Sequence, residues 1–298
     1  MPALRDLVGY GAEPPDANWP GGARIAVQVV VNVEEGAERS VIMGDGESEA
    51  FLSEMVGAVS HRGARAMAME SLYEYGSRAG FWRLFRILTE RNIPATAFAV
   101  TEALRLNPPV TEAMIAADWE IASHGLRWLD YQNIPEDVER EHRDRAIALH
   151  KELTGDRPLG WYTGRTSPMT AELIAEEGGF VYHADSYADD VPYYEVHGEN
   201  HQLVVPYSLD ANDMKFVAYQ GFAEAEQFYR YLRDTFDMLY REGGRMMSVG
   251  LHGRVAGRPA RALAVARFLD HALAHNDVWF ARRIDIARHW LKEHPYAD

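Results

Sequence analysis

One continuous apolar run limits the possible folds of this chain more than any other feature. Residues 24–36 read Arg-Ile-Ala-Val-Gln-Val-Val-Val-Asn-Val-Glu-Glu-Gly, and β-branched residues dominate them. Continuous runs of this kind are typical of parallel strands that are buried on both faces. The run ends at Glu34 and Glu35, and α/β proteins collect catalytic groups at the carboxyl ends of strands. We therefore predict a central strand that leads into a site; the alternative interpretation of the two acids is a solvated turn.

Strand and helix patterns alternate along the rest of the chain. The expected strands cover 95–100, 119–123, 159–163, 180–184, 203–207, 246–251 and 278–281. The expected helices cover 77–91, 110–117, 135–151, 167–178, 228–240 and 258–274, with Ser77 as the N-cap of the first. About eight strands that alternate with helices, without a linker, favour an α/β fold with a single distorted (β/α) barrel over a doubly wound sheet. We expect one catalytic domain over 1–298, with an N-terminal wrap (1–23) and an insertion (37–79).

Composition excludes several partners and chemistries. The net charge of −15, without any block of Lys or Arg, argues against binding to nucleic acid or to a membrane surface. The absence of cysteine excludes disulfides, thiolate catalysis and Cys-based zinc sites. The first residues lack a signal-peptide pattern, and no run reaches the roughly 18 apolar residues of a membrane helix. We therefore expect a cytoplasmic protein that acts on a small molecule.

Polar side chains recur just past the predicted strands. Besides the two glutamates they are His124, Arg165, Asp185 and His252, which are far apart in the sequence. Each has a structural alternative: a buried histidine with satisfied hydrogen bonds, a surface ion pair, or a helix or loop cap. Because a barrel brings the carboxyl ends of its strands to one mouth, we expect these residues to line a single cavity.

The same residues resemble the motifs of the polysaccharide-deacetylase superfamily, whose fold is a distorted (β/α) barrel. That family has an acidic pair after the first strand, a His-x-x-x-His metal motif, an Arg-x-Pro segment, an aspartate and a late Leu-His. The counterparts here are Glu34-Glu35, His124 to Trp128, Arg165 to Pro168, Asp185 and Leu251-His252. The resemblance extends over nearly the whole chain.

One departure from the family motifs bears on metal binding. Trp128 stands at the position of the second metal-binding histidine, and an indole nitrogen only donates hydrogen bonds. A hydrolytic metal site needs about three protein ligands. Glu35 and His124 supply two, and His183 or Asp185 is the only candidate for the third. We therefore expect no metal cofactor, while residual binding of a divalent ion near Glu35 and His124 stays open.

Several longer runs resemble one subgroup, the cofactor-independent allantoinases of that superfamily. They are Asn32–Gly36, Glu74–Gly80, Gly160–Pro168, Ala184–Asp190 and Arg282–His289. The resemblance implies hydrolysis of the hydantoin ring of allantoin to allantoate, a role in purine catabolism, and a homo-oligomer, by resemblance a tetramer. A ureido nitrogen leaves more easily than the amine expelled from an acetylated sugar, so loss of a metal worth several kcal/mol is consistent with this substrate.

These considerations assign catalytic roles to three residues. We expect Glu35 to act as general base on water, Glu34 to raise its pKa, and His252 to protonate the leaving nitrogen. The alternative functions are hydrolysis of another cyclic imide or ureide, metal-dependent N-deacetylation of a carbohydrate, and a non-catalytic binding or scaffold role.

Four further residues are expected to bind or frame the substrate. Arg165 and His124 are assigned to its carbonyl or ureido group, through charge-assisted hydrogen bonds. Trp128 is expected to form a wall of the pocket and exclude water. Asp185 is expected to orient Arg165 or His252.

Overall fold

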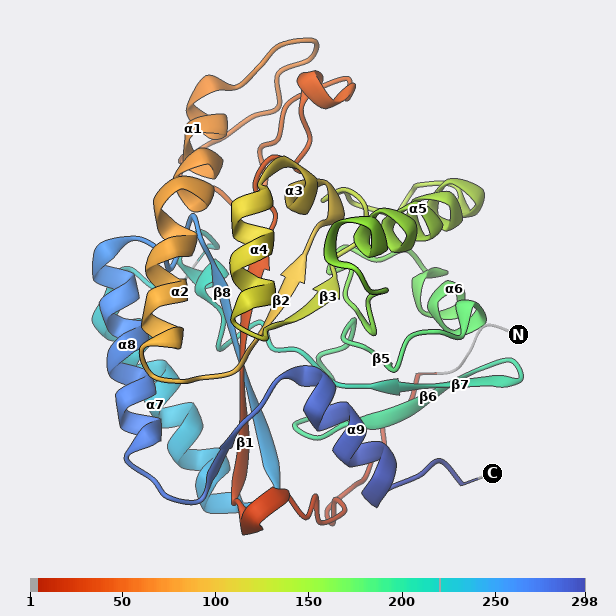
Figure 1. Cartoon of the computed structure of the whole chain (residues 1–298), viewed down its shortest axis with the longest axis vertical. Coiled ribbons are helices and arrows are strands. Elements are labelled where there is room, and N and C mark those ends of the chain that lie inside the picture. Colours follow the sequence, from red (N-terminus) through yellow and green to blue (C-terminus); the bar gives the residue numbers. More distant parts are fainter. Residues whose placement is uncertain (1–4, 220, 298) are drawn as a thin grey trace.

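The computed structural model describes residues 5–219 and 221–297, so residues 1–4 of the expected N-terminal wrap lie outside the described chain. Its strands are β1 (Ile25–Val33), β2 (Ala95–Ala99), β3 (Glu120–Ser123), β4 (Gly160–Trp161), β5 (Tyr182–His183), β6 (Tyr193–His197), β7 (Asn200–Val204), β8 (Arg245–His252) and β9 (Val278–Phe280). Their order across the sheet is β6-β7-β5-β4-β3-β2-β1-β8, with β9 also paired to β1. The sheet curls into a half-barrel (Figure 1), which confirms the expected distorted (β/α) barrel.

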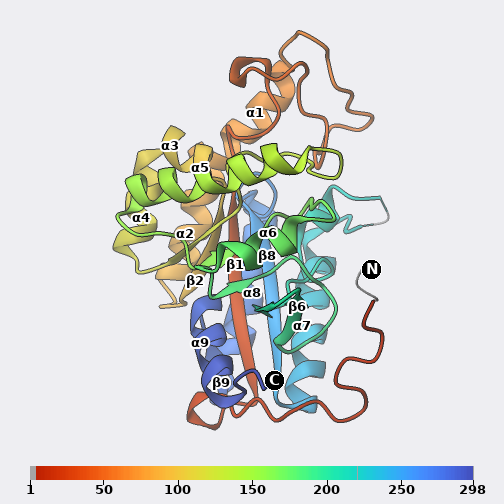
Figure 2. The ribbon, with the colours of Figure 1, turned by 90° about the vertical axis from the view of Figure 1, so that its right-hand side faces the viewer.

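Helices surround the curled sheet (Figure 1, Figure 2). They are α1 (Met67–Tyr75), α2 (Phe81–Thr89), α3 (Thr101–Leu106), α4 (Pro108–Ala116), α5 (Glu136–Thr154), α6 (Thr170–Glu177), α7 (Ala225–Glu242), α8 (Pro259–Leu273) and α9 (Arg283–Glu293). Short 3₁₀ turns lie at Pro20–Gly22, Val41–Met43 and Asp213–Phe216. None of the helices in the described residues combines the length and the apolar character that crossing a bilayer requires.

Strand β1 is buried along its whole length, as its continuous apolar sequence predicts. Ile25 and Val27 pack with apolar side chains of helices α2, α7 and α8. The alternate residues Ala26 and Val30 pack on the other side of the sheet, in a second cluster with Phe98 of β2. Because both faces of β1 are covered, its carboxyl end is held in a fixed position at the mouth of the half-barrel.

The insertion folds over the carboxyl ends of the strands, at the top of Figure 1, and leads into α1. The prediction that Ser77 caps a helix is wrong. Ser77 lies within a π-helical turn, Gly76–Gly80, that joins α1 to α2 without a break. A side chain at Gly80 would collide with the backbone of Gly253, so glycine allows this continuous helix to approach the end of β8 closely.

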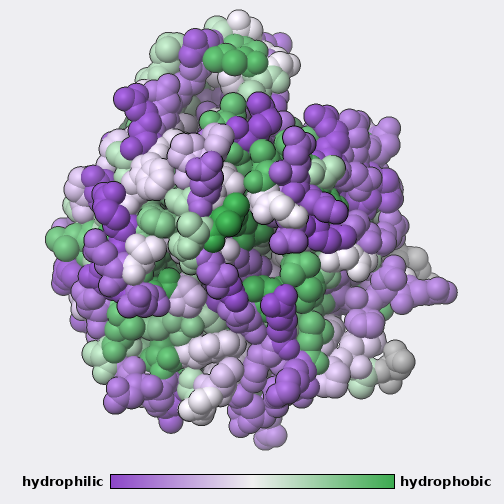
Figure 3. All heavy atoms as spheres, in the orientation of Figure 1, coloured by the Kyte–Doolittle hydropathy of each residue, from purple (hydrophilic) through white to green (hydrophobic). Residues whose placement is uncertain are grey.

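Part of the insertion presents apolar side chains to solvent. Ile42, Val56, Val59 and Met67 are each at least 60% exposed. In the surface view, hydrophobic residues also appear on the part of the molecule that projects at the top (Figure 3). The expected role of this segment in a subunit contact stays a prediction.

The sheet contains one hairpin that the sequence patterns did not predict. A single strand was expected over 203–207, whereas β6 and β7 pair antiparallel around a turn at Gly198, which has a positive φ of 63°. The two strands contain Glu195, His197, Asn200 and His201, whose polar side chains hide the alternating pattern of a strand. Helices α3 and α9 were also not predicted.

Candidate active site

Four of the predicted residues meet at the carboxyl ends of three strands. Glu34 and Glu35 follow β1, His124 follows β3, and His252 is the last residue of β8. Strands β1 and β8 are parallel neighbours in which Asn32 pairs with His252, so the two glutamates lie beside this histidine. All four side chains are buried, with exposed fractions of at most 7%.

The Glu34 carboxylate is the centre of this cluster. Its Oε1 lies 3.3 Å from Nε2 of His124 and 3.4 Å from Nε2 of His252. Its Oε2 lies 2.7 Å from Nη1 of Arg254. The other ring nitrogen of His124, Nδ1, lies 3.1 Å from the carbonyl oxygen of Tyr162, and this contact orients the ring. Burial alone would raise the pKa of Glu34, but Arg254 and the two histidines outweigh it and hold the pKa well below its ordinary value.

Arg254 belongs to the cluster although the sequence analysis did not identify it. Its guanidinium is 4% exposed and lies over the rings of Tyr73, at 4.4 Å, and Trp128, at 5.2 Å. Apart from the ion pairs of its Nη1 with Glu34 and, at 4.0 Å, with Oε1 of Glu35, its nitrogens make no hydrogen bond to any described residue. Buried guanidinium nitrogens without partners are expected where a ligand accepts their hydrogen bonds. The feature of the sequence that could have identified Arg254 is its positive charge two residues past His252, at the end of a predicted strand.

Glu35 lies against glycines on two sides. Its Oε1 has no hydrogen-bond partner among the described residues, whereas Oε2 accepts a 3.2 Å hydrogen bond from the Glu34 backbone nitrogen. A side chain at Gly76 would collide with the Glu35 carboxyl group, and one at Gly253 would lie 3.3 Å from Oε1. Burial raises the pKa of Glu35, Glu34 adds to the rise, and Arg254 opposes it. Burial is therefore a larger cause than the repulsion by Glu34 that the sequence analysis invoked.

His252 is held by an aspartate that was also missed. Its Nδ1 lies 2.6 Å from Oδ1 of Asp213, and Oδ2 of Asp213 accepts hydrogen bonds from the backbone nitrogens of His252 and Ala256. Burial alone would lower the pKa of His252, but the Asp213 and Glu34 carboxylates raise it to about 9. The imidazole is therefore a protonated acid at neutral pH. Asp213 lies beyond the expected strand 203–207, where no pattern distinguished it.

Arg165 and Trp128 lie together at one side of the cluster. The Arg165 guanidinium stacks 4.2 Å from the Trp128 ring and donates a 2.6 Å hydrogen bond to the Trp128 carbonyl oxygen. Phe51 from the insertion packs against Trp128, with ring centroids 5.9 Å apart. The guanidinium groups of Arg165 and Arg254 thus both contact the Trp128 ring.

Asp185 does not contact the side chains that it was expected to orient. Its carboxylate accepts hydrogen bonds of 2.7–2.9 Å from the backbone nitrogens of Thr163 and Gly164. No hydrogen bond or ion pair within the described residues joins it to Arg165 or His252. The expectation is corrected: Asp185 fixes the loop that precedes Arg165 and affects that residue only through the backbone.

The donor set at Glu34 fits a divalent cation poorly. The Glu34 carboxylate is already paired with the permanently charged Arg254, which lies over the ring of Trp128, and the Trp128 indole nitrogen can only donate a hydrogen bond. His183, one of the two candidates for a third ligand, lies 3.4 Å from Glu195 of strand β6 instead. Groups of three ligand atoms within 4.8 Å of one another occur elsewhere in residues 5–219 and 221–297, but this cluster is not among them.

The insertion closes over the cluster. The cavity beside Tyr73 and Arg254 has a volume of about 10 Å³, and Leu52, Ser53 and Glu54 of the insertion help to line it. A cavity of that size holds about one water molecule. Of the cluster, Arg254 lines this cavity.

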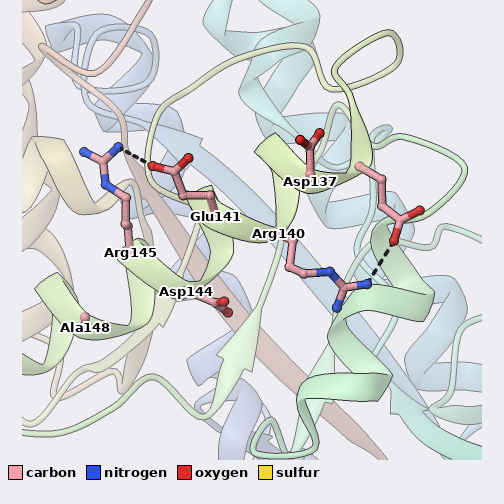
Figure 4. Close-up of a pocket in the computed structure, with 7 residues that line it drawn as sticks. Asp137, Arg140, Glu141, Asp144, Arg145 and Ala148 are labelled. Carbon is pink, nitrogen blue, oxygen red and sulfur yellow. Dashed lines mark hydrogen bonds and ion pairs between the residues drawn. The ribbon is translucent and has the colours of Figure 1, made fainter.

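An open hollow of larger volume lies elsewhere on the described surface. It has a volume of about 850 Å³ and runs along helix α5, where its lining side chains project outward from one face (Figure 4). Arg145 pairs there with Glu141 at 3.3 Å, and Arg140 pairs with Glu176 of α6 at 2.7 Å. Most of the charged side chains that line this hollow thus form solvent-exposed ion pairs. None of the residues at the strand ends lines it.

Comparisons with known proteins agree with the motifs. A family model described as polysaccharide deacetylase matches residues 65–180. A Schizosaccharomyces pombe protein assigned to the polysaccharide deacetylases is 38% identical over 99% of both chains. The solved structure of a Pseudomonas aeruginosa protein assigned to the same group has 57% identity and a TM-score of 0.97, over 99% of this chain and 100% of that one.

A second solved structure is that of PuuE allantoinase. It has 55% identity to this chain and a TM-score of 0.97, with both chains covered completely. A TM-score of 0.97 over the full length shows that the two chains share the whole fold, including the strand ends that hold Glu34, Glu35 and His252. The chain therefore belongs to the polysaccharide deacetylase family and is a hydrolase of that superfamily.

Proposed function

We propose that the chain hydrolyses an amide C–N bond of a cyclic ureide, with allantoin as substrate and allantoate as product, and that it does so without a metal ion. The likeness to PuuE allantoinase over the whole chain supports the substrate. The observation that supports the mechanism is a pair of buried groups with opposite tasks: Glu35, with a raised pKa, and His252, a protonated acid with a pKa of about 9.

Glu35 is proposed as the general base. Its Oε1 accepts no hydrogen bond from the described residues, so this oxygen can still accept one from a water molecule. The raised pKa makes the carboxylate a stronger base toward that water, which would attack the ring carbonyl carbon. Glu34 keeps its negative charge beside Arg254 and the histidines, and it holds those groups in position.

Arg254 is proposed to bind the carbonyl oxygen on which negative charge develops. Apart from the ion pairs of Nη1 with Glu34 and Glu35, its nitrogens lack partners among the described residues, and the surrounding rings exclude water, which strengthens a charge-assisted hydrogen bond. Arg165 was assigned to this task from the sequence, but its guanidinium stacks on Trp128 and donates its hydrogen bond to the Trp128 carbonyl oxygen. We therefore propose that Arg165 acts at the periphery of the pocket, where it supports Trp128.

His252 is proposed to protonate the nitrogen that leaves when the tetrahedral intermediate collapses. Negative charge on a ureido nitrogen delocalises onto neighbouring carbonyl groups, so this departure is easier than that of an amine. One guanidinium and one protonated imidazole then supply the positive charge near the reacting atoms. The insertion is proposed to open for substrate entry and to close before the reaction, which excludes bulk water.

The decisive experiment combines one substitution with one substrate panel. Glu35→Gln is expected to reduce kcat for allantoin about 10²–10⁴-fold, because it removes the general base and preserves the shape of the side chain. Glu141→Gln, on the exposed face of α5, is the matched control and should retain activity. Near-normal activity of Glu35→Gln would refute the assignment of the base.

The panel comprises allantoin, hydantoin, succinimide and an acetylated chitooligosaccharide, each assayed with and without a chelator. Ring opening of allantoin that is unaffected by the chelator supports the proposal. Activity that disappears with the chelator and returns with zinc contradicts metal independence. Preferential turnover of the chitooligosaccharide would instead identify a carbohydrate deacetylase.

A further inference from the structure

A second group of ionisable side chains lies outside the half-barrel, where helices α7 and α8 pack together (Figure 1). It consists of Asp237 from α7, His271 from the last turn of α8, and His275 just after that helix ends. One ligand atom of each residue lies within 4.8 Å of the others. None of these residues contributes to the cluster at the strand ends.

The contacts within this group are direct. Nε2 of His271 lies 2.7 Å from Oδ1 of Asp237. The rings of His271 and His275 have centroids 5.3 Å apart, as expected for side chains four positions apart at a helix end. The ring of Phe236 packs against both histidines, at 5.6 and 5.1 Å, and so limits their rotation.

The hydrogen bond of His275 prepares this residue to act as a ligand. Its Nδ1 lies 3.1 Å from the backbone carbonyl oxygen of His271, and a carbonyl only accepts, so Nδ1 carries the hydrogen. The neutral ring then keeps a free lone pair on Nε2. Histidines that bind metals commonly donate their other ring nitrogen to a carbonyl in this way. The C-terminal end of α8 also favours a positive charge at this position.

We propose that Asp237, His271 and His275 form a binding site for a divalent cation of the Zn²⁺ type, which ties α7 to the end of α8. Two imidazoles and a carboxylate are the ligand types that zinc prefers in the absence of cysteine. The side chains of His271 and Asp237 are 26% and 43% exposed, so the ion can enter from solvent and water can complete its coordination. The site is structural and separate from the proposed hydrolytic centre.

A rival group of three fits less well. His183, Glu195 and His197 also have ligand atoms within 4.8 Å of one another. However, Nδ1 of His183 accepts a 3.3 Å hydrogen bond from the backbone nitrogen of Asp185. This contact already uses one ring nitrogen, and the His183 side chain is only 2% exposed, so an ion reaches it from solvent less readily than it reaches His271 and Asp237.

Equilibrium dialysis of the full chain against Zn²⁺, followed by elemental analysis, tests the proposal. The wild type is expected to retain one equivalent of zinc at this site. His271→Gln and His275→Gln should each weaken binding by about tenfold or more, since even outer-shell changes typically cost about 10–100-fold. Asp237→Asn should also weaken it, while keeping a hydrogen bond to His271. His61→Gln, which removes an exposed imidazole, is the matched control.

Thermal melting supplies a second readout that does not depend on activity. Zinc should raise the Tm of the wild type and of His61→Gln but not that of His271→Gln, because an ion that binds only the folded state stabilises it. The zinc-free variants should melt like the zinc-free wild type, which shows that they fold. The proposal is overturned if the wild type binds no zinc, if His271→Gln and His275→Gln bind it as tightly as the wild type, or if His197→Gln alone abolishes binding.

Discussion

Replacing Asp213 with asparagine is expected to shift the alkaline limit of activity to lower pH. The carboxylate of Asp213 lies 2.6 Å from Nδ1 of His252 and is the largest cause that raises the pKa of this ring. Asparagine has nearly the same shape and can still accept a backbone hydrogen bond, but it lacks the negative charge. The substitution therefore tests electrostatics at His252 with little change in packing.

The size of the effect follows from the pKa of His252. The rise from 6.5 to about 9 corresponds to roughly 3 kcal/mol in favour of the charged ring. At about pH 8, a ring with a pKa of about 9 is about nine-tenths protonated, whereas one at 6.5 is about 3% protonated. If the variant loses the whole rise, the acid form falls about thirtyfold at this pH, and by less than about twofold near pH 6.

The assay is the pH profile of kcat/KM for allantoin, together with an NMR titration of the His252 ring, which does not depend on turnover. Activity that requires the protonated ring is lost as pH rises through the pKa, so the alkaline limb should move toward 6.5 in Asp213→Asn. Asp137→Asn, an exposed carboxylate on α5 (Figure 4), is the control and should leave the profile unchanged. An alkaline limb at the same pH in wild type and Asp213→Asn would refute the role of this pair.

Three further outcomes are expected. Gly80→Ala should lower the free energy of unfolding by about 1–3 kcal/mol, and with it Tm, because the added methyl group would collide with the Gly253 carbonyl. Gly46→Ala places its methyl group in open space and should leave Tm unchanged. Burial raises the pKa of Glu38 from 4.5 to about 7, so the free energy of unfolding should fall as pH rises between these values, and a urea titration series on Glu38→Gln should lack this fall. Light scattering is expected to show a homo-oligomer, and shortening the apolar insertion (37–79) should give smaller species; a monomeric wild type would contradict this.

Residues close together in the sequence were sufficient to predict the frame of the molecule. The run at 24–36 became β1 because a strand with apolar residues on both faces is stable only in the middle of a covered sheet. The expected helix over 135–151 forms as α5, which ends at the C-cap Gly155, a residue with a positive φ of 91° that helix ends favour. The alternation of strands and helices then placed Glu34, Glu35, His124 and His252 at one end of the barrel, without knowledge of any distance.

The partners of these four residues were decided by the tertiary structure. Asp213 carries no local pattern, and the only signal at Arg254 is its position just past a strand. Both matter because burial in the fold makes each nearby charge strong enough to change a pKa. The same limit applies to Ser77, whose capping signal was overridden by the close contact of Gly80 with another segment. Sequence periodicity records which face of an element is buried, whereas the protonation state of a buried group depends on neighbours that only the folded chain brings together.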